Sequence, residues 1–202
     1  MGEDEIFSGV FCFVTEFGYN ERMDTVFSPE EFVLPDGLVL TLRPIRPDDV
    51  TRLQEFHSRL SSETIYYRFL ENHPVLLDKE AKYFTTLDYV NRMAIVATIK
   101  YFDREEIVGV ARYDVFTPHQ TDTAEAAFVI EDRFQGQGLG TAMMLLLARL
   151  ALEQGVYYFV FTVHWTNEGM LKLLRKSGEV VERHQSGGVY DVRVQLSAFV
   201  GL

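Results

Sequence analysis

The sequence contains very little cysteine and no long hydrophobic run. Cys12 is the only cysteine among 202 residues, which excludes an internal disulfide framework and a zinc site made of several cysteines. No apolar segment has the length needed to cross a bilayer, and the amino terminus lacks a basic region followed by an apolar run. We therefore expect a cytoplasmic protein with no membrane partner.

Basic residues are also scarce. Lys and Arg total 19 against 30 Asp and Glu, which gives a formal net charge of −11 at pH 7. Such a surface repels the phosphates of nucleic acids and attracts cationic groups, for example lysine side chains and polyamines. We expect no nucleic-acid partner. We also expect no metal site, because no metal-ligand spacing is found among the five histidines, His57, His73, His119, His164 and His184.

Length and composition indicate one domain with a small appendage. A chain of 202 residues that is 47% hydrophobic can bury a full single-domain core. Residues 1–36 are predicted to be an N-terminal extension of unknown role, because a turn signal follows at Pro35–Gly37. Within the extension, Phe7–Phe17 predicts a strand or small hairpin, and Ser28 before Pro29 predicts a short helical turn. We expect it to pack on the main domain or on a second subunit of a homodimer.

Residues 37–202 carry the periodicities of an α/β domain. Alternating or continuous apolar runs predict strands over 38–42, 93–99, 107–115, 124–130, 156–163, 180–182 and 189–196. Apolar residues at spacings of three and four, with capping residues before them, predict helices over 48–59, 61–70, 78–85, 139–155 and 167–176. The order of these elements predicts helices flanking a central sheet.

The stretch from Glu125 to Thr141 joins a strand, a glycine loop and a helix. Ala126–Ile130 is a short apolar run that predicts a buried strand, and a strongly helical pattern begins at Leu139. Unpaired amides at such a helix start can hold an anion, and glycines before it let a phosphate approach the backbone. The alternative is a glycine-rich turn that only lets the strand and the helix pack closely.

The glycine spacing excludes two common phosphate-binding motifs. After Gly136 and Gly138, the dinucleotide motif G-x-G-x-x-G requires a third glycine where Thr141 stands, and the acidic residue that would bind the ribose is also missing. A P-loop requires Gly-Lys-Ser or Gly-Lys-Thr, which this loop lacks. The pattern that is present is Gln-x-x-Gly-x-Gly, at Gln135, Gly138 and Gly140.

This pattern resembles the acyl-CoA pyrophosphate loop of the GNAT acetyltransferase superfamily, and the predicted element order over residues 38–196 resembles the GNAT order. Within that superfamily the chain is most similar to the catalytic domain of Pat-type bacterial protein lysine acetyltransferases. Three stretches carry this likeness, namely Leu42–Asp49, Leu60–Phe69 and Ala124–Phe128. The resemblance implies a GNAT fold with a central twisted mixed sheet, and an N-acetyltransferase that uses acetyl-CoA and no metal.

The resemblance also implies where acetyl-CoA binds. The amides of residues 137–141 would hold the pyrophosphate, and the backbone of residues 128–130 would pair with the pantetheine arm as an added strand. The asparagine that contacts coenzyme A in the family corresponds to Asn167, which also suits a helix cap. The expected cofactor-binding residues are therefore Phe128, Val129, Ile130, Gln135, Gly136, Gln137, Gly138, Leu139, Gly140, Thr141 and Asn167.

Acetyl transfer to an amine requires a base, because lysine has a pKa of about 10.4 and only about one molecule in a thousand is neutral at pH 7. Glu125 is the expected catalytic residue, since it matches the glutamate taken as the general base in Pat-type proteins. Its apolar neighbours in the sequence predict burial, which would make the carboxylate a stronger base. The alternative is a solvated glutamate at a strand edge.

One position departs from the family pattern. Many GNAT enzymes carry a tyrosine seven residues after the asparagine to protonate the thiolate, and here that position is Leu174. Tyr190 and Tyr113 are alternative donors, as is water.

The acceptor is expected to be an amine, in the first place a protein lysine, in agreement with the acidic surface. The alternatives are a small-molecule acetyltransferase that acts on a polyamine, an aminoglycoside or an amino acid, and a non-catalytic acyl-CoA sensor.

Overall fold

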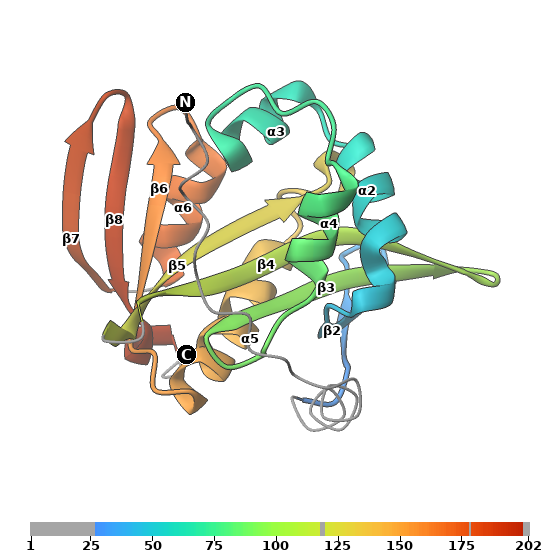
Figure 1. The fold of residues 1–202 in the computed structure, drawn as a ribbon, viewed down its shortest axis with the longest axis horizontal. Coiled ribbons are helices and arrows are strands. Elements are labelled where there is room, and N and C mark those ends of the chain that lie inside the picture. Colours follow the sequence, from blue (N-terminus) through green and yellow to red (C-terminus); the bar gives the residue numbers. More distant parts are fainter. Residues whose placement is uncertain (1–26, 118–119, 178, 200–202) are drawn as a thin grey trace, which may run out of the picture.

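A computed structural model describes residues 27–117, 120–177 and 179–199, which form a single eight-stranded sheet (Figure 1). The strand order is β1-β2-β3-β4-β5-β6-β8-β7, and all neighbours pair antiparallel except β5 and β6, which are parallel. The strand bounds are β1 Glu30–Val33, β2 Val39–Pro44, β3 Arg92–Tyr101, β4 Arg104–Thr117, β5 Gln120–Ile130, β6 Tyr158–His164, β7 Glu179–Ser186 and β8 Val189–Gln195. This mixed sheet confirms the predicted fold class.

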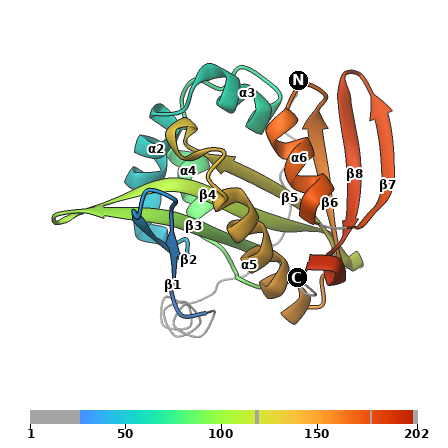
Figure 2. The same ribbon diagram turned by 180° about the vertical axis from the view of Figure 1, so that it is seen from behind.

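Helices cover both faces of the sheet. α2 and α4 lie over one face and α5 lies over the other, while α6 packs beside α5 and α3 lies near β5 (Figures 1 and 2). Among the residues that the structure describes, no helix is long and apolar enough to cross a membrane. The helix bounds are α2 Val50–Ser58, α3 Ser62–Phe69, α4 Asp78–Thr85, α5 Leu139–Glu153 and α6 Glu168–Ser177, with short 3-10 turns at Pro47–Asp49, Asp132–Phe134 and Leu196–Phe199.

The segment just before residue 37 is a strand, so the helical turn predicted from Ser28 and Pro29 is wrong. β1 pairs antiparallel with β2 along its whole length. This pairing satisfies more backbone groups than one isolated helical turn could. Glu30 also forms an ion pair with Arg149 of α5. The hairpin predicted over Phe7–Phe17 lies outside the described residues.

Arg43, in the Leu-Arg-Pro stretch, has a structural role. Its side chain is 3% exposed, and it donates to both carboxylate oxygens of Asp49, at 2.7 and 2.8 Å. It also donates to both oxygens of Glu105, at 3.0 and 2.9 Å. Burial alone would lower the pKa of the Arg43 guanidinium, but the two carboxylates outweigh burial and raise it above its ordinary value. This buried cluster ties β2 to β4 and to the start of α2.

β5 and β6 separate after three residue pairs, as the diverging strands in Figure 1 show. Parallel pairing begins at Thr123 with Tyr158 and ends at Glu125 with Val160. β5 nevertheless continues to Ile130, paired with β4 on one side only in the described structure. Its other edge is therefore open to an extended ligand that could pair as an additional strand.

Candidate active site

The glycine loop between β5 and α5 presents free backbone amides. Gly138 is the N-cap residue of α5 with φ +90°, and Gly136 has φ +72°, conformations that favour glycine. Throughout the described structure, the amides of residues 136–140 donate no hydrogen bond. The amides of Thr141 and Ala142 already donate to the Gly138 carbonyl, at 3.0 and 3.1 Å. Of the amides of residues 137–141, which the sequence predicts to bind the pyrophosphate, those of residues 137–140 are therefore unpaired in the described structure, whereas helical pairing begins at Thr141.

Side chains around the loop hold it in place. Gln135 Nε2 donates to the Ile130 carbonyl at 2.9 Å and to Thr64 Oγ1 at 3.2 Å. Asp132 accepts hydrogen bonds from Ser61 N and Oγ, at 3.0 and 2.6 Å, and from Thr64 Oγ1 at 2.9 Å. Burial opposes ionisation of Asp132, but these bonds outweigh it and keep its pKa below the usual value. The loop and the start of α3 are thus one hydrogen-bonded unit.

A cleft of about 850 Å³ opens where β5 and β6 diverge. Of the twelve predicted site residues, only Gln137 and Leu139 do not line it. The Gln137 side chain donates to the Arg133 carbonyl at 2.8 Å, and Leu139 is fully buried in the core, so both would contribute backbone amides alone. The other ten line the cleft: Glu125, Phe128, Val129, Ile130, Gln135, Gly136, Gly138, Gly140, Thr141 and Asn167.

Glu125 lies where the two strands part, and its side chain is exposed. The prediction that its neighbours bury it is wrong. Successive residues of a strand point to opposite faces, so Ala124 and Ala126 are buried on the other side of the sheet. Glu125 shares its face with Ala127 and Val129, and all three line the cleft. A substrate in the cleft can therefore reach the carboxylate.

Asn167 has the cap role that the sequence predicts. Its Oδ1 accepts from the Met170 amide at 3.0 Å, and its side chain also lines the cleft. Leu174, at the position of the usual tyrosine, is buried in the core at 2% exposure and has no proton to offer.

Neither alternative tyrosine donor lines the cleft. Tyr113 is fully buried, it donates to the Val90 carbonyl at 3.0 Å, and burial raises its pKa. The Tyr190 ring packs instead under the Arg183 guanidinium, 3.7 Å from the ring centroid. In the part of the chain that the structure describes, the tyrosine that lines the cleft is Tyr67, whose hydroxyl donates to Glu63 at 2.8 Å.

The sequence analysis missed two of the cations of the cleft. Lys172 and Lys176 lie one turn apart on α6 and line the cleft together with Arg68 of α3, which belongs to the Leu60–Phe69 stretch that carries the family likeness. No motif marks the two lysines, because their place in the cleft depends on how the helices pack. The spacing of the two lysines on the helix that Asn167 caps was the one available signal.

The fold and the cleft together define a class of protein. A family profile described as the acetyltransferase (GNAT) domain matches residues 39–180. The chain belongs to this family, so it is an N-acetyltransferase that uses acetyl-CoA.

The similar proteins support a Pat-type relation. Acetyltransferase PA5475 of Pseudomonas aeruginosa is 32% identical over 154 residues, which cover 74% of this chain and 80% of that protein. Acetyltransferase Pat of Mycolicibacterium smegmatis is 31% identical over 170 residues, which cover 84% of this chain but only 50% of Pat. The crystal structure of the GNAT domain of S. lividans PAT superposes with a TM-score of 0.75 at 33% identity and covers 83% of this chain and 96% of that one.

The residues of the loop fit the phosphates of acetyl-CoA. Among the described residues, the five consecutive amides of residues 136–140 find no hydrogen-bond acceptor, and the lysines of α6 lie in the same cleft. Gly140 also has a packing role, since a Cβ there would lie 3.3 Å from Ile130 Cδ1. Over the described ranges, no group of three or more His, Cys, Asp or Glu side chains could hold a metal ion.

Replacing Lys172 and Lys176 by alanine together should weaken acetyl-CoA binding about fivefold, because each exposed ion pair with a phosphate is worth up to about 1 kcal/mol. The loss should shrink as salt is added, since exposed charges are screened. Calorimetric titration at low and high salt measures both effects. Arg175→Ala is the matched control, because Arg175 is exposed on the same helix and does not line the cleft. Equal losses of acetyl-CoA affinity in the double lysine variant and in the Arg175→Ala protein would contradict the assignment of Lys172 and Lys176 to the binding site.

Proposed function

We propose that this protein transfers the acetyl group of acetyl-CoA to a lysine side chain of another protein, with Glu125 as the general base. The observation that carries the proposal is the position of Glu125. Its exposed carboxylate lies where β5 and β6 part, in the same cleft as the unpaired amides of residues 136–140. A base at this point is accessible both to an incoming amine and to a thioester held along β5.

Each group of residues in the cleft has its own role in the proposed reaction. The loop amides hold the pyrophosphate, and the open edge of β5 receives the pantetheine arm. Glu125 takes a proton from the lysine ammonium, directly or through one water. The amine nitrogen then bonds to the acyl carbon, the carbon–sulfur bond breaks, and coenzyme A leaves as a thiolate. The nitrogen loses its second proton to water, and the thiolate takes a proton from water, which leaves a neutral amide and a thiol. A cysteine thiol has a pKa of about 8.5, and coenzyme A carries the same kind of alkyl thiol. Its thiolate is therefore a good leaving group, so Leu174 is compatible with turnover.

Two observations favour a protein lysine as the acceptor. The chain carries a net charge of −11, which attracts cationic side chains. The cleft is large, and Glu125 is exposed within it, so a long side chain on a protein surface can reach the carboxylate. The Pat-type relation points to the same class of acceptor.

Acetyl-CoA consumption, followed by thiol release, tests the acceptor. We expect turnover with a bacterial acetyl-CoA synthetase as the acceptor protein, and an acetyl-lysine in its mass spectrum. The same acceptor with its lysines dimethylated is the matched control and should not react. Turnover confined to a panel of polyamines and other small amines would overturn the lysine assignment. Acetyl-CoA binding without turnover on any acceptor would favour the non-catalytic acyl-CoA sensor.

A further inference from the structure

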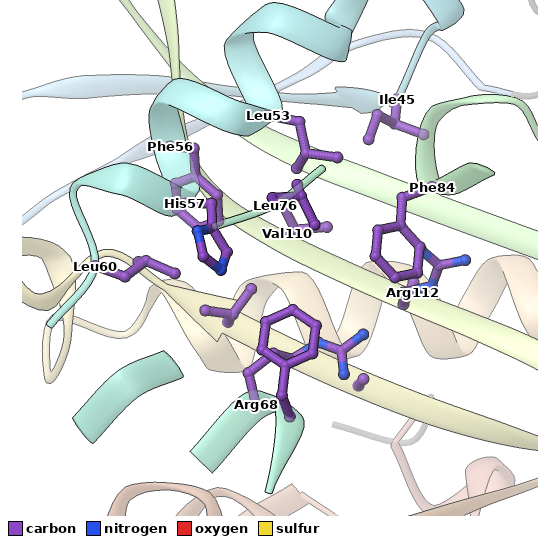
Figure 3. A pocket seen from close by; sticks show the side chains of 13 residues that line it. Ile45, Leu53, Phe56, His57, Leu60, Arg68, Leu76, Phe84, Val110 and Arg112 are labelled. Atoms are coloured by element: carbon purple, nitrogen blue, oxygen red, sulfur yellow. The ribbon is translucent and has the colours of Figure 1, made fainter. Parts of the chain in front are cut away.

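Arg68 is a cation of the cleft that has no counterion in the described structure. Figure 3 shows its side chain extending from α3 across β5. The side chain is half-buried, and among the residues that the structure describes it forms no hydrogen bond and no ion pair. Its nitrogens are accessible, because the buried side-chain nitrogens without a partner in these ranges belong to other residues, namely His57, His73 and Arg193. A ligand in the cleft can therefore reach the guanidinium.

Other arginines in comparable surroundings have carboxylate partners. Arg59, Arg92 and Arg112 are also buried or half-buried, and each pairs with at least one carboxylate. Arg68 instead contacts the face of the Phe69 ring, with 4.9 Å between the guanidinium carbon and the ring centroid. An aromatic face stabilises a cation but does not accept a strong hydrogen bond. Because a charge partly removed from water is unfavourable without a partner, Arg68 should bind an anion that enters the cleft.

The guanidinium of Arg68 lies beside the proposed base. Burial and the charge of Arg112 lower the pKa of Arg68 to about 10, against the opposite effect of Glu125 and Asp114, so the side chain is a cation at pH 7. Asp114 stands opposite Glu125 in the pairing of β4 with β5, and it is already paired with Arg92 and Arg112, at 2.8 and 3.1 Å. Glu125 and Arg68 form no ion pair with each other or with the rest of the described chain. The cleft thus presents a carboxylate and a guanidinium that are both available to a ligand.

We propose that Arg68 binds a carboxylate of the acceptor protein, namely the side chain of an Asp or Glu close to the lysine that is acetylated. The inference rests on the proposed function, because Glu125 places the lysine. A guanidinium near Glu125 repels the lysine ammonium, and an acidic neighbour brought in with the lysine offsets this repulsion. The carboxylate also accepts charge-assisted hydrogen bonds from the planar guanidinium, which can donate two in parallel. Arg68 therefore selects lysines that have an acidic neighbour.

The position of Arg68 separates it from the phosphates of acetyl-CoA. The charges that act on Arg68 belong to Glu125 and to residues of β4. The free amides for the pyrophosphate begin only at residue 136, and β5 from Glu125 to Ile130 alone spans about 16 Å. The acetyl group itself carries no charge. The acceptor is thus the substrate that can bring an anion to Arg68.

Short peptides with blocked ends and a single lysine test this inference on the full chain. In an otherwise uncharged sequence, one glutamate is placed at each position within two residues of the lysine, and a matched set carries glutamine there. We expect kcat/KM to be about tenfold higher with glutamate than with glutamine at one or more of these positions, the effect of one charge-assisted hydrogen-bonded pair in a partly buried site.

Variants of Arg68 connect this preference to the guanidinium. Arg68→Gln should bring the ratio of kcat/KM between glutamate and glutamine peptides to about one, and Arg68→Lys should keep part of the preference because the cation remains. The ratio is taken within each protein, so a general loss of activity cancels. Arg175→Gln is the matched control and should keep the wild-type ratio, since Arg175 is exposed on α6 and does not line the cleft.

Three results would overturn the inference. One is equal kcat/KM for the glutamate and glutamine peptides at every position in the wild type, and another is a preference that persists in the Arg68→Gln protein. The third is a preference for succinyl-CoA over acetyl-CoA that Arg68→Gln abolishes, with no preference among the peptides, which would place the carboxylate on the donor. Failure of the proposed function is distinguishable, because calorimetric titration of the same peptides into the protein with bound coenzyme A ranks their affinities even if no lysine is acetylated.

Discussion

The Glu125→Gln protein should turn over acetyl-CoA about 100- to 10,000-fold more slowly than the wild type near neutral pH, the loss typical of a missing general base. Glutamine has nearly the same shape as glutamate but cannot accept the proton of the lysine ammonium. Because the loop amides and the edge of β5 are unchanged, the affinity for acetyl-CoA should stay close to that of the wild type. Thiol release measures kcat, and calorimetric titration measures the affinity.

The pH dependence separates a lost base from a damaged site. Without a base, the rate should rise about tenfold for each pH unit until the pH approaches the lysine pKa of about 10.4, because the neutral amine becomes more abundant. Glu168→Gln is the control, since it removes another exposed carboxylate from the same cleft. That protein should keep wild-type turnover. A Glu125→Gln protein with unchanged kcat, or with a pH profile parallel to that of the wild type, would rule out the base.

The Asp49→Asn protein should be less stable than the wild type by about 1.5–3 kcal/mol, the cost of weakening buried hydrogen bonds to a charged group. Asp49 has no exposed surface, and it accepts two hydrogen bonds from Arg43, one from the Arg46 amide and one from Arg52. Asparagine keeps the size of the side chain but removes one of the two carboxylates that compensate Arg43, since Glu105 remains. Urea unfolding should show a lower midpoint with an unchanged slope.

Asp48→Asn provides the matched comparison for this prediction. Asp48 is the preceding residue, its side chain is 71% exposed, and its one ion pair within the described ranges is with Arg52, at 3.7 Å. An exposed pair of this kind contributes about 0–1 kcal/mol, so we expect little change in the free energy of unfolding. Similar losses in the free energy of unfolding of the Asp49→Asn and Asp48→Asn proteins would show that the buried cluster around Arg43 makes no specific contribution to stability.

The glycine loop was predictable because its signals are local. The alternating glycines and the start of a strongly apolar helix lie within one short stretch, and α4 likewise begins and ends at the predicted residues. The start of the sheet was not predictable in this way. Ser28 followed by Pro29 suits a helical turn as well as the approach to a strand, and only pairing with β2 decides between them.

The environment of Glu125 shows a second limit of prediction from the sequence. Apolar neighbours in the sequence predict burial only if they surround the side chain in space. In a strand they point to the opposite face, and on the side of β6 the adjacent strand turns away. The positions of the α6 cations in the cleft depend on contacts between elements far apart in the chain, which no local pattern contains.

The parting of β5 and β6 has a mechanical consequence. Across the middle of the described sheet, β1 to β5 and β6 to β8 are joined by three residue pairs, whereas β3 and β4 pair along most of their length. The two parts of the sheet are therefore connected by a short stretch of strand pairing. A ligand that pairs with β5 adds hydrogen bonds where the sheet has the fewest residue pairs between strands. Occupancy of the cleft would then stiffen the whole molecule as well as supply the acyl group.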